Sequence, residues 1–382
     1  MKPFYRGLRL GIVGGGQLGR MMIQAAVDFN VHIRILDPSG EAPAKAYAHE
    51  FVRGSLTDYD TVLAFGREAE VITIEIENVN TEALEQLQAE GKTVFPDPKI
   101  LRLIQDKRKQ KEFFRDNGLP TAPFIRVENR GDIIKNKHLL PAVNKTAVAG
   151  YDGRGVQVLR SAEDLLQAFD TPGLLESYVS FEKEIAVIVA RNPQGEIRIF
   201  PAVEMVFHPI HNLVEYLFAP AEISESLTKR AGEIAVSVVQ KLRYVGVMAI
   251  EMFVTASGEI LINELAPRPH NSGHHTIRAC LTSQYEQHLR AILSLPLGPV
   301  EQFCPAAMVN LLGESGYSGP AVYEGIEEIL AMEGVYPHIY GKAETQPQRK
   351  MGHVTILGKD KTELTEKISY IRQAVRVVSG GL

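Results

Sequence analysis

The hydrophobic positions of this chain begin with a repeated order of strand and helix. Residues 8–13 form a short apolar run that is typical of a buried strand, and a glycine turn at residues 14–19 follows it directly. The next segment has helical periodicity, and residues 31–37 form a second strand-like run. This order predicts a βαβ unit in a Rossmann-like α/β domain. A further strand at residues 71–76 brings Glu75 to the same carboxyl edge, where open α/β sheets bind their ligands.

The pattern changes after the breaker cluster Pro96-Asp97-Pro98, which we expect to end the first domain. A charged helix is predicted over residues 100–117, because Gly118 and Pro120 follow it. Beyond it we expect an α+β lid module at about residues 122–181, with one helix at 162–168, and then a core helix at 231–241. Strand signals dominate the tail. The predicted domains are therefore residues 1–98, 99–303 and 304–382, the last of them rich in β-strand.

Composition limits the possible partners of the chain. Its 382 residues are 45% hydrophobic and 23% charged, and the formal net charge is −5, which is typical of a soluble globular protein. An acidic balance argues against nucleic acid or an anionic membrane as the main partner. No stretch approaches the ~20 apolar residues of a membrane span. The two cysteines form no disulfide framework or metal-binding spacing, so we expect a cytoplasmic protein.

Residues 263–276 hold the densest group of candidate chemical residues. They follow a predicted β-hairpin of residues 248–253 and 259–262, which places Glu251 on one strand and Glu264 at the end of the other. Two carboxylates on one face of neighbouring strands could bind Mg²⁺ together with phosphate oxygens. Two solvated acids are the alternative.

Three other motifs each allow two interpretations. Gly14, Gly16 and Gly19 match the G-x-G-x-x-G fingerprint, and Asp37 stands roughly where a ribose-binding acid would be. This match would predict a dinucleotide enzyme, although other ligands can also approach such a turn. Residues 150–155, near Lys145, are either a mobile lid over phosphates or the tip of a glycine-rich hairpin. The cations of the tail form either an anion pocket or a solvated face; they are Lys342, Arg349 and Lys350.

Taken together, the motifs resemble those of the ATP-grasp ligases over nearly the whole chain. The longest of them are similar to those of the N5-carboxyaminoimidazole ribonucleotide synthases; they are GGGQLGRM, EIEN, GYDGRG, NELAPRPHNSGHHT and YGK…RKMGH. The resemblance implies an ATP-grasp fold with a Rossmann-like N-terminal domain, a central domain with a small lid, and a β-rich C-terminal domain. It also implies a homodimer.

The resemblance further implies an ATP site with Mg²⁺ as the second cofactor. Lys107 and Lys145 would hold the phosphates, Glu176 and the backbone of Val179 would bind adenine, and Glu184 would hold the ribose. Glu251 and Glu264 would bind the metal. The other implied ATP contacts are Gly150, Tyr151, Asp152, Gly153, Arg154, Gly155, His211 and Asn263. Two departures from the family pattern leave a choice between Lys107 and Arg108, and another between His208 and His211.

The resemblance also implies a site for aminoimidazole ribonucleotide. Its residues would be Gln17, Leu18, Glu75, Tyr151, Asp152, Arg154, Asn271, Ser272, Lys342, Arg349 and Lys350. Residues 268–272 would surround bicarbonate, so that the implied catalytic residues are Lys145, Arg268, His270 and Asn271. His274 and His275 have no assigned role.

The implied activity is the ATP- and bicarbonate-dependent carboxylation of 5-aminoimidazole ribonucleotide through carboxyphosphate, in purine synthesis. A sibling enzyme that formylates glycinamide ribonucleotide with formate is the nearest alternative, and Asn271 favours the carboxylase, because the sibling resembles an aspartate there. A dinucleotide-dependent oxidoreductase and a non-catalytic nucleotide-binding module are more distant alternatives. The oxidoreductase leaves the lid, the paired glutamates and the basic tail unexplained. The binding module is disfavoured because Mg²⁺ ligands and Arg268 suit group transfer better than binding alone.

Overall fold

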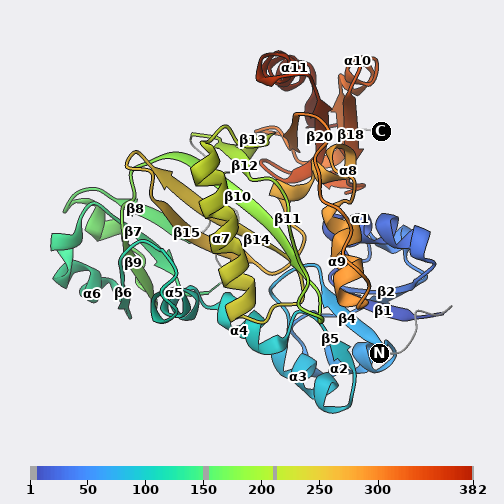
Figure 1. Ribbon diagram of the computed structural model, residues 1–382, viewed down its shortest axis with the longest axis horizontal. Coiled ribbons are helices and arrows are strands. Elements are labelled where there is room, and N and C mark those ends of the chain that lie inside the picture. Colours follow the sequence, from blue (N-terminus) through green and yellow to red (C-terminus); the bar gives the residue numbers. More distant parts are fainter. Residues whose placement is uncertain (1–6, 149–154, 210–212, 381–382) are drawn as a thin grey trace.

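The computed structural model describes residues 7–148, 155–209 and 213–380 (Figure 1). Its N-terminal part is a five-stranded parallel sheet in the order β3-β2-β1-β4-β5, which confirms the predicted βαβ unit. The strands are β1 (Arg9–Val13), β2 (His32–Asp37), β3 (Glu50–Arg53), β4 (Val71–Ile74) and β5 (Thr93–Val94). The helices are α1 (Gln17–Ala26), α2 (Tyr59–Arg67) and α3 (Thr81–Ala89). Strand β4 ends at Ile74, so Glu75 lies just beyond the carboxyl edge of the sheet.

The charged segment after this sheet forms two helices, so the prediction of one continuous helix over residues 100–117 was wrong. Helix α4 (Pro98–Gln105) and helix α5 (Lys107–Asp116) meet at Asp106, which has the extended dihedrals φ −113° and ψ 108°. The Asp106 side chain accepts a hydrogen bond from Arg108 N and caps α5. The break places Lys107 at the first position of a new helix.

The lid module is a four-stranded antiparallel sheet in the order β6-β9-β7-β8. Its elements are β6 (Phe124–Val127), α6 (Arg130–Lys135), β7 (Ala142–Thr146), β8 (Val156–Leu159) and β9 (Gly173–Ser177). The helix predicted at residues 162–168 is only a 3-10 turn at Asp164–Gln167. The Asp164 carboxylate accepts hydrogen bonds from the backbone amides of Arg160 and Ser161, and this closes a tight turn.

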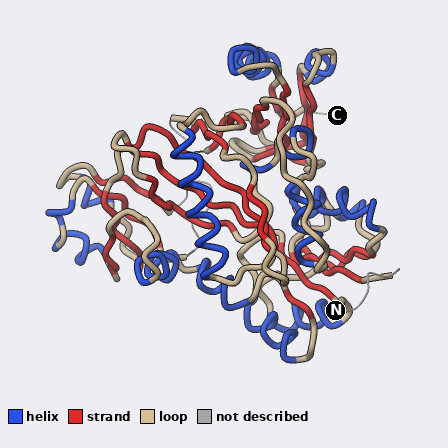
Figure 2. The backbone as a smooth tube through the Cα atoms, viewed as in Figure 1, coloured by secondary structure: helices blue, strands red, loops and turns tan. Residues whose placement is uncertain are grey.

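A nine-stranded antiparallel sheet within the described ranges crosses the middle of the molecule (Figure 2). The order is β15-β14-β10-β12-β13-β16-β20-β18, and β11 pairs with β10. The strands are β10 (Phe181–Arg191), β11 (Ile197–Ile199), β12 (Val203–Phe207), β13 (Val214–Ala219), β14 (Gly246–Thr255), β15 (Ile260–Ala266), β16 (Ala306–Leu312), β18 (Val335–Ile339) and β20 (Lys350–Leu357). Because β13 pairs with β16, one sheet continues across the division predicted at residues 303 and 304.

Helices cover both faces of this sheet. The longest, α7 (Glu225–Lys241), buries Ile234 and Val238 in one core with β10 and β14. On the opposite face, α9 (Gln284–Ile292) packs against the sheet and also against α1, so it joins the N-terminal part to the centre (Figure 1). A short helix, α8 (Thr276–Ala279), precedes it.

The C-terminal part contains more helix than its strand signals predict. A small sheet in the order β19-β17-β21 joins β17 (Gly319–Glu324), β19 (Glu344–Thr345) and β21 (Arg376–Ser379). Helix α10 (Ile326–Leu330) and the unpredicted helix α11 (Lys361–Ala374) pack on the strands, with Leu364, Ile368 and Ile371 buried.

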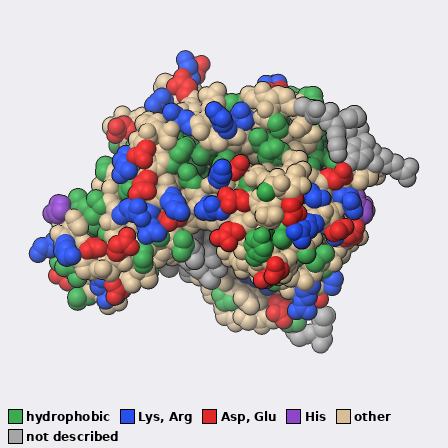
Figure 3. Space-filling view, turned by 90° about the horizontal axis from the view of Figure 1, so that it is seen from below, with side chains coloured by type: hydrophobic (Ala, Val, Ile, Leu, Met, Phe, Trp, Pro, Cys, Tyr) green, Lys and Arg blue, Asp and Glu red, His purple; other side chains and the backbone are tan. Residues whose placement is uncertain are grey.

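Charged side chains of both signs are interspersed on the face of the molecule seen in Figure 3. Within the described residues, no helix combines the length and the apolar composition that a membrane span requires.

Candidate active site

Lysines and carboxylates from four elements meet between the lid sheet and the large sheet. Helix α5 supplies Lys107, whose Nζ lies 2.7 Å from Glu264 Oε2 on β15. Strand β7 supplies Lys145, whose Nζ donates to Asn263 Oδ1 at 2.9 Å and lies 3.2 Å from Glu176 Oε2 on β9. A small cavity at this point is lined by Lys107, Gln110, Lys111, Lys145, Glu176, Asn263 and Glu264. We call these seven residues the lysine–glutamate cluster.

The geometry distinguishes Lys107 from its neighbour Arg108. The Arg108 guanidinium donates to the Asp106 carboxylate at 2.9 Å and lies 3.7 Å from Glu128, so it faces away from the cluster. Lys107 alone of the two contacts Glu264 in the described structure. His208 directly follows β12, whereas His211 lies outside the described residues, so the choice between these two histidines stays open.

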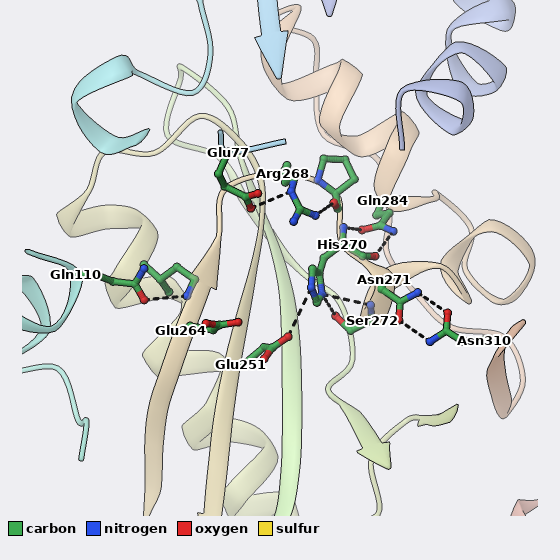
Figure 4. A network of polar contacts seen from close by, with 12 residues as sticks. Glu77, Gln110, Glu251, Glu264, Arg268, His270, Asn271, Ser272, Gln284 and Asn310 are labelled. Atoms are coloured by element: carbon green, nitrogen blue, oxygen red, sulfur yellow. Dashed lines mark hydrogen bonds and ion pairs between the residues drawn. The ribbon is translucent and has the colours of Figure 1, made fainter. Parts of the chain in front are cut away.

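Two further carboxylates, those of Glu251 and Glu184, interact with Glu264 of the cluster. Glu251 on β14 pairs in register with Glu264 on β15, as the predicted hairpin requires, and the two side chains lie next to each other (Figure 4). Burial raises the pKa of Glu251 well above its ordinary value, and the charges of Glu264 and Glu184 raise it further. Burial and then the charge of Glu264 raise the pKa of Glu184 to about 8. The charge of Lys107 instead lowers the pKa of Glu264 to about 2.

This mutual repulsion fits a site that a cation would complete. Hard divalent cations prefer carboxylate oxygens, and Glu251 and Glu264 present such oxygens from adjacent strands. Among the described residues, no group of three or more His, Cys, Asp or Glu side chains is arranged to hold a metal by itself. A metal at this place would therefore need oxygens from a ligand as well.

The loop after β15 joins three parts of the molecule, and we call residues 268–272 the junction loop. Arg268 Nε lies 2.9 Å from Glu77 Oε1 of the N-terminal part, and His270 Nε2 lies 3.6 Å from Glu251 Oε1 (Figure 4). His270 Nδ1 is 2.9 Å from Ser272 Oγ, and Asn271 is hydrogen-bonded to Asn310 on β16 of the C-terminal part. The loop thus lies where the three parts meet.

Two carboxylates accept hydrogen bonds from backbone amides at the glycine turn of the N-terminal sheet. Glu75 accepts a hydrogen bond from Leu18 N at 3.1 Å, and a Cβ at Gly16 would overlap its Oε1. The Asp37 carboxylate accepts hydrogen bonds from the backbone amides of Gly15 and Ser39, both at 2.8 Å. Because both carboxylates occupy backbone donors that a dinucleotide would need, the oxidoreductase alternative loses its support.

The tail cations gather at the start of β20. Lys342 Nζ donates to Lys350 O at 2.7 Å, and Arg349 Nη1 donates to Glu344 O at 2.6 Å. The positive charge of Lys350 partly opposes the rise in the pKa of Glu251, so Lys350 lies within electrostatic range of the acid pair. Gln17 begins α1 at the glycine turn, and Val179 lies just after β9.

Several predicted contacts cannot be placed. The lid residues Gly150, Tyr151, Asp152, Gly153 and Arg154 lie outside the described residues. Gly155 follows them with a φ of +72°, and its carbonyl accepts a hydrogen bond from Thr146 N at 2.9 Å.

Sequence reasoning missed three residues that hold this site together. Lys111 stands four positions after Lys107, a spacing that places both on one side of a helix and could have revealed it. Gln110 Oε1 accepts a hydrogen bond from Leu265 N at 3.2 Å. Asn310 carried no local signal, because only the pairing of β13 with β16 brings it to the junction loop.

A lid sheet facing a large antiparallel sheet, with lysines and carboxylates between them, defines an ATP-grasp protein. The sequence matches the ribonucleotide synthetase preATP-grasp domain over residues 8–105 and the ATP-grasp domain over residues 112–285. It also matches the phosphoribosylaminoimidazole carboxylase C-terminal domain over residues 306–367.

Nearly the whole chain is similar to members of one ATP-grasp family. It is 36% identical to the N5-carboxyaminoimidazole ribonucleotide synthase of Bacillus subtilis, over 96% of this chain and 95% of the relative. The solved N5-carboxyaminoimidazole ribonucleotide synthetase of Thermotoga maritima superposes with a TM-score of 0.91 at 43% identity, over 98% of this chain and 100% of that chain. The synthase of Aspergillus clavatus, solved in complex with ADP and 5-aminoimidazole ribonucleotide, has a TM-score of 0.88 at 31% identity, over 96% and 98%.

The chain belongs to the N5-carboxyaminoimidazole ribonucleotide synthase family and is an ATP-grasp ligase. Some relatives are longer: the chain spans 66% of the chloroplastic phosphoribosylaminoimidazole carboxylase of Vigna aconitifolia, to which it is 37% identical.

Proposed function

We propose that this chain carboxylates 5-aminoimidazole ribonucleotide with ATP and bicarbonate, and releases N5-carboxyaminoimidazole ribonucleotide, ADP and phosphate for purine (IMP) biosynthesis. The junction loop is the observation that carries the proposal. It lies beside the acid pair, where Arg268 meets Glu77 and His270 meets Glu251. The complex of the Aspergillus clavatus relative with ADP and 5-aminoimidazole ribonucleotide supports the choice of substrates.

ATP is bound by the lysine–glutamate cluster. Lys107 and Lys145 contact the phosphates, since polyphosphate favours ammonium donors that are held in place. Adenine lies against Glu176 and the backbone of Val179, and Glu184 binds the ribose hydroxyls. The described members of this set come from α5, β7 and the β9–β10 segment, so the packing of the lid sheet beside the large sheet brings them together.

Magnesium would be held by Glu251 and Glu264, with Asn263 beside the second carboxylate and phosphate oxygens completing its shell. When bound, it would neutralise charge on the triphosphate. Without a ligand, the carboxylates of Glu251, Glu184 and Glu264 repel one another, and this repulsion supports the proposed position of the metal.

The chemistry has two steps. A bicarbonate oxygen attacks the γ-phosphorus of ATP, the bond from that phosphorus to the ADP oxygen breaks, and carboxyphosphate forms. The exocyclic amine of the ribonucleotide then attacks the carboxyl carbon of carboxyphosphate, or of CO₂ released from it, while phosphate leaves and the amine loses a proton. Lys145 and Arg268 neutralise developing charge, and His270 orients bicarbonate or moves the proton.

The ribonucleotide lies between the glycine turn and the tail cations. Its phosphate is a dianion, and Lys342, Arg349 and Lys350 supply matching positive charge. Gln17, Leu18 and Glu75 contact the base, together with Asn271 and Ser272. Tyr151, Asp152 and Arg154 lie outside the described residues, and the family resemblance implies that they contribute to this pocket.

The proposals of a homodimer and of a cytoplasmic location have more indirect support. The family resemblance implies a homodimer, which sedimentation of the purified chain would test. Cys280 and Cys304 are free thiols, which fits the reducing cytoplasm.

The deciding assay measures ADP release with either bicarbonate or formate, each with aminoimidazole ribonucleotide and with glycinamide ribonucleotide. We expect release only with bicarbonate and aminoimidazole ribonucleotide. Release that requires formate and glycinamide ribonucleotide would instead establish the formylating sibling.

Arg268→Ala tests the role of the junction loop. It should reduce turnover by about 100-fold or more, while the dissociation constant for ADP changes by less than about threefold, because Arg268 acts on charge that develops in the transition state. Full turnover by the variant would remove Arg268 from the mechanism.

A further inference from the structure

Lys111 is a buried lysine behind the proposed phosphate site. Helix α5 places it four positions after Lys107, and only 3% of the residue is exposed. Its Nζ donates to Thr121 Oγ1 at 2.7 Å and lies 3.2 Å from Glu176 Oε2. Burial lowers the pKa of Lys111 to about 8, although the Glu176 carboxylate opposes this shift, so the side chain is mainly charged at neutral pH.

Two ammonium groups share one carboxylate oxygen at this point. Lys111 Nζ and Lys145 Nζ each lie 3.2 Å from Glu176 Oε2. Burial would raise the pKa of the Glu176 carboxyl, but the positive charges of Lys145 and Lys111 outweigh burial and hold its pKa below the ordinary value. Glu176 is therefore an ionised carboxylate in a buried position, with 3% of the residue exposed.

This sharing matters because Lys145 is the lysine that we place on the ATP phosphates. The Lys145 ammonium has three N–H donors, of which Asn263 and Glu176 occupy two, so a phosphate that takes more than the third donor competes with Glu176 for Lys145. A buried carboxylate that loses its only ionic partner is strongly destabilised. Lys111 prevents that situation, since it stays beside Glu176 when Lys145 turns to the nucleotide.

We infer that Lys111 is a positioning residue of the nucleotide site, which neutralises Glu176 and so leaves Lys145 able to bind the phosphates. The inference rests on the proposed function. Lys111 itself touches neither the phosphates nor the reacting atoms. In its absence Glu176 would hold Lys145 as its single partner, and nucleotide binding would become weaker.

A purely structural role for Lys111 has different consequences. Lys111 also fastens α5 to β15, because Thr121 Oγ1 accepts its hydrogen bond and in turn donates to Ile262 O at 2.9 Å. If this contact were its whole contribution, Thr121→Val and Lys111→Met would lower the melting temperature together. Neither would change nucleotide affinity in a way that depends on Glu176.

The experiment measures the dissociation constant for ADP with Mg²⁺ by calorimetry, and the melting temperature, for K111M, E176Q and the double variant. K111M should weaken ADP binding by about tenfold or more, whereas K111M/E176Q should bind within about threefold of E176Q, because a neutral glutamine does not retain Lys145. K109M is the matched control, since it removes the same charge from an exposed position of α5. T121V controls for the structural contact. Both controls should bind ADP within about twofold of the wild type.

The possible failures are distinguishable. If the wild-type chain does not bind ADP, the proposed function is wrong. If the wild type binds ADP and K111M binds equally well, or if the losses in K111M and E176Q simply add, the role of Lys111 is wrong. Should circular dichroism show that K111M is unfolded, K111Q replaces it, because glutamine keeps a donor for Thr121 without the charge.

Discussion

Asn271 and Asn310 exchange two hydrogen bonds across the junction between the central and C-terminal parts. Asn271 Nδ2 donates to Asn310 Oδ1 at 2.9 Å, and Asn310 Nδ2 donates to Asn271 Oδ1 at 3.0 Å. Both residues are buried, and Asn310 Nδ2 also donates to Val214 O at 2.7 Å. The orientation of the Asn271 amide is therefore set by a strand from another part of the chain.

Asn310→Ala should weaken binding of the ribonucleotide. The change leaves the buried amide of Asn271 without its partner, which should cost about 1–3 kcal/mol in the free energy of unfolding. We expect the KM for aminoimidazole ribonucleotide to rise by about tenfold, while the KM for ATP stays within about twofold. Steady-state kinetics with each substrate varied in turn measures both.

Asn192→Ala is the control, because Asn192 is equally buried and hydrogen-bonded to Glu196 but lies away from the junction loop. It should lower stability without changing either KM. An unchanged KM for the ribonucleotide in Asn310→Ala would exclude Asn271 from the substrate site.

Gly16→Ala should disturb the Glu75 side of the same pocket. A Cβ at Gly16 would overlap Glu75 Oε1, the atom that accepts the hydrogen bond from Leu18 N. We expect the displaced carboxylate to raise the KM for the ribonucleotide by about tenfold, with little effect on ADP binding. Gly40→Ala offers a matched comparison, since the nearest atom to its Cβ would be Arg53 Nη1 at 4.0 Å. Equal KM values for the two variants would contradict a role for Glu75.

Local patterns predicted much of this fold and of its acid pair. The βαβ unit and the β14–β15 hairpin with Glu251 opposite Glu264 follow from alternation and turn signals alone. The sequence predicts one helix where the structure has α4 and α5, because a capping aspartate such as Asp106 cannot be distinguished from the other polar residues of a charged segment. Helix α11 is not predicted, because strand signals dominate the sequence of the tail.

The remaining features depend on contacts between distant residues. The hydrogen bonds of Asn271 with Asn310 and of Thr73 with His288 join segments 39 and 215 positions apart, and no local pattern carries that information. The charge state of a carboxylate such as Glu176 likewise depends on which lysines the folded chain brings to it. Sequence motifs therefore predicted which side chains form the site better than they predicted the contacts of those side chains.

His288 should make stability depend on pH. It connects β4 to β14, because its Nδ1 accepts from Val247 N at 3.1 Å and its Nε2 lies 3.0 Å from Thr73 Oγ1. Burial lowers the pKa of His288 from 6.5 to about 3. A proton on Nδ1 would also break the hydrogen bond that Nδ1 accepts from Val247 N. Its contribution is complete above pH 6.5 and is lost as the pH falls from 6.5 toward 3, where the unfolded chain takes up the proton first.

At about pH 5 this loss should be on the order of 2 kcal/mol. His288→Gln removes the titrating group, so its free energy of unfolding should decrease less than that of the wild type between about pH 7 and 5. Urea denaturation at each pH gives these values. The partly exposed His32, which pairs with Glu50 on the surface, provides the control variant His32→Gln. A slope in His288→Gln equal to the wild-type slope would assign the acid sensitivity to other groups.

Glu251→Gln should separate stability from turnover. Burial and the charges of Glu264 and Glu184 raise the pKa of Glu251, so at neutral pH the folded chain has either to keep this carboxylate charged or to take up a proton, and glutamine removes that cost. We expect the melting temperature to stay the same or to rise by a few degrees, while turnover falls by about 100-fold or more because a metal ligand is lost. Thermal denaturation with ADP should show stabilisation by added Mg²⁺ in the wild type and little in the variant. Glu259→Gln, on the exposed turn between the same two strands, should behave like the wild type in both measurements. A variant that is strongly destabilised but retains its Mg²⁺ response would mean that Glu251 serves the structure of the hairpin and not the metal.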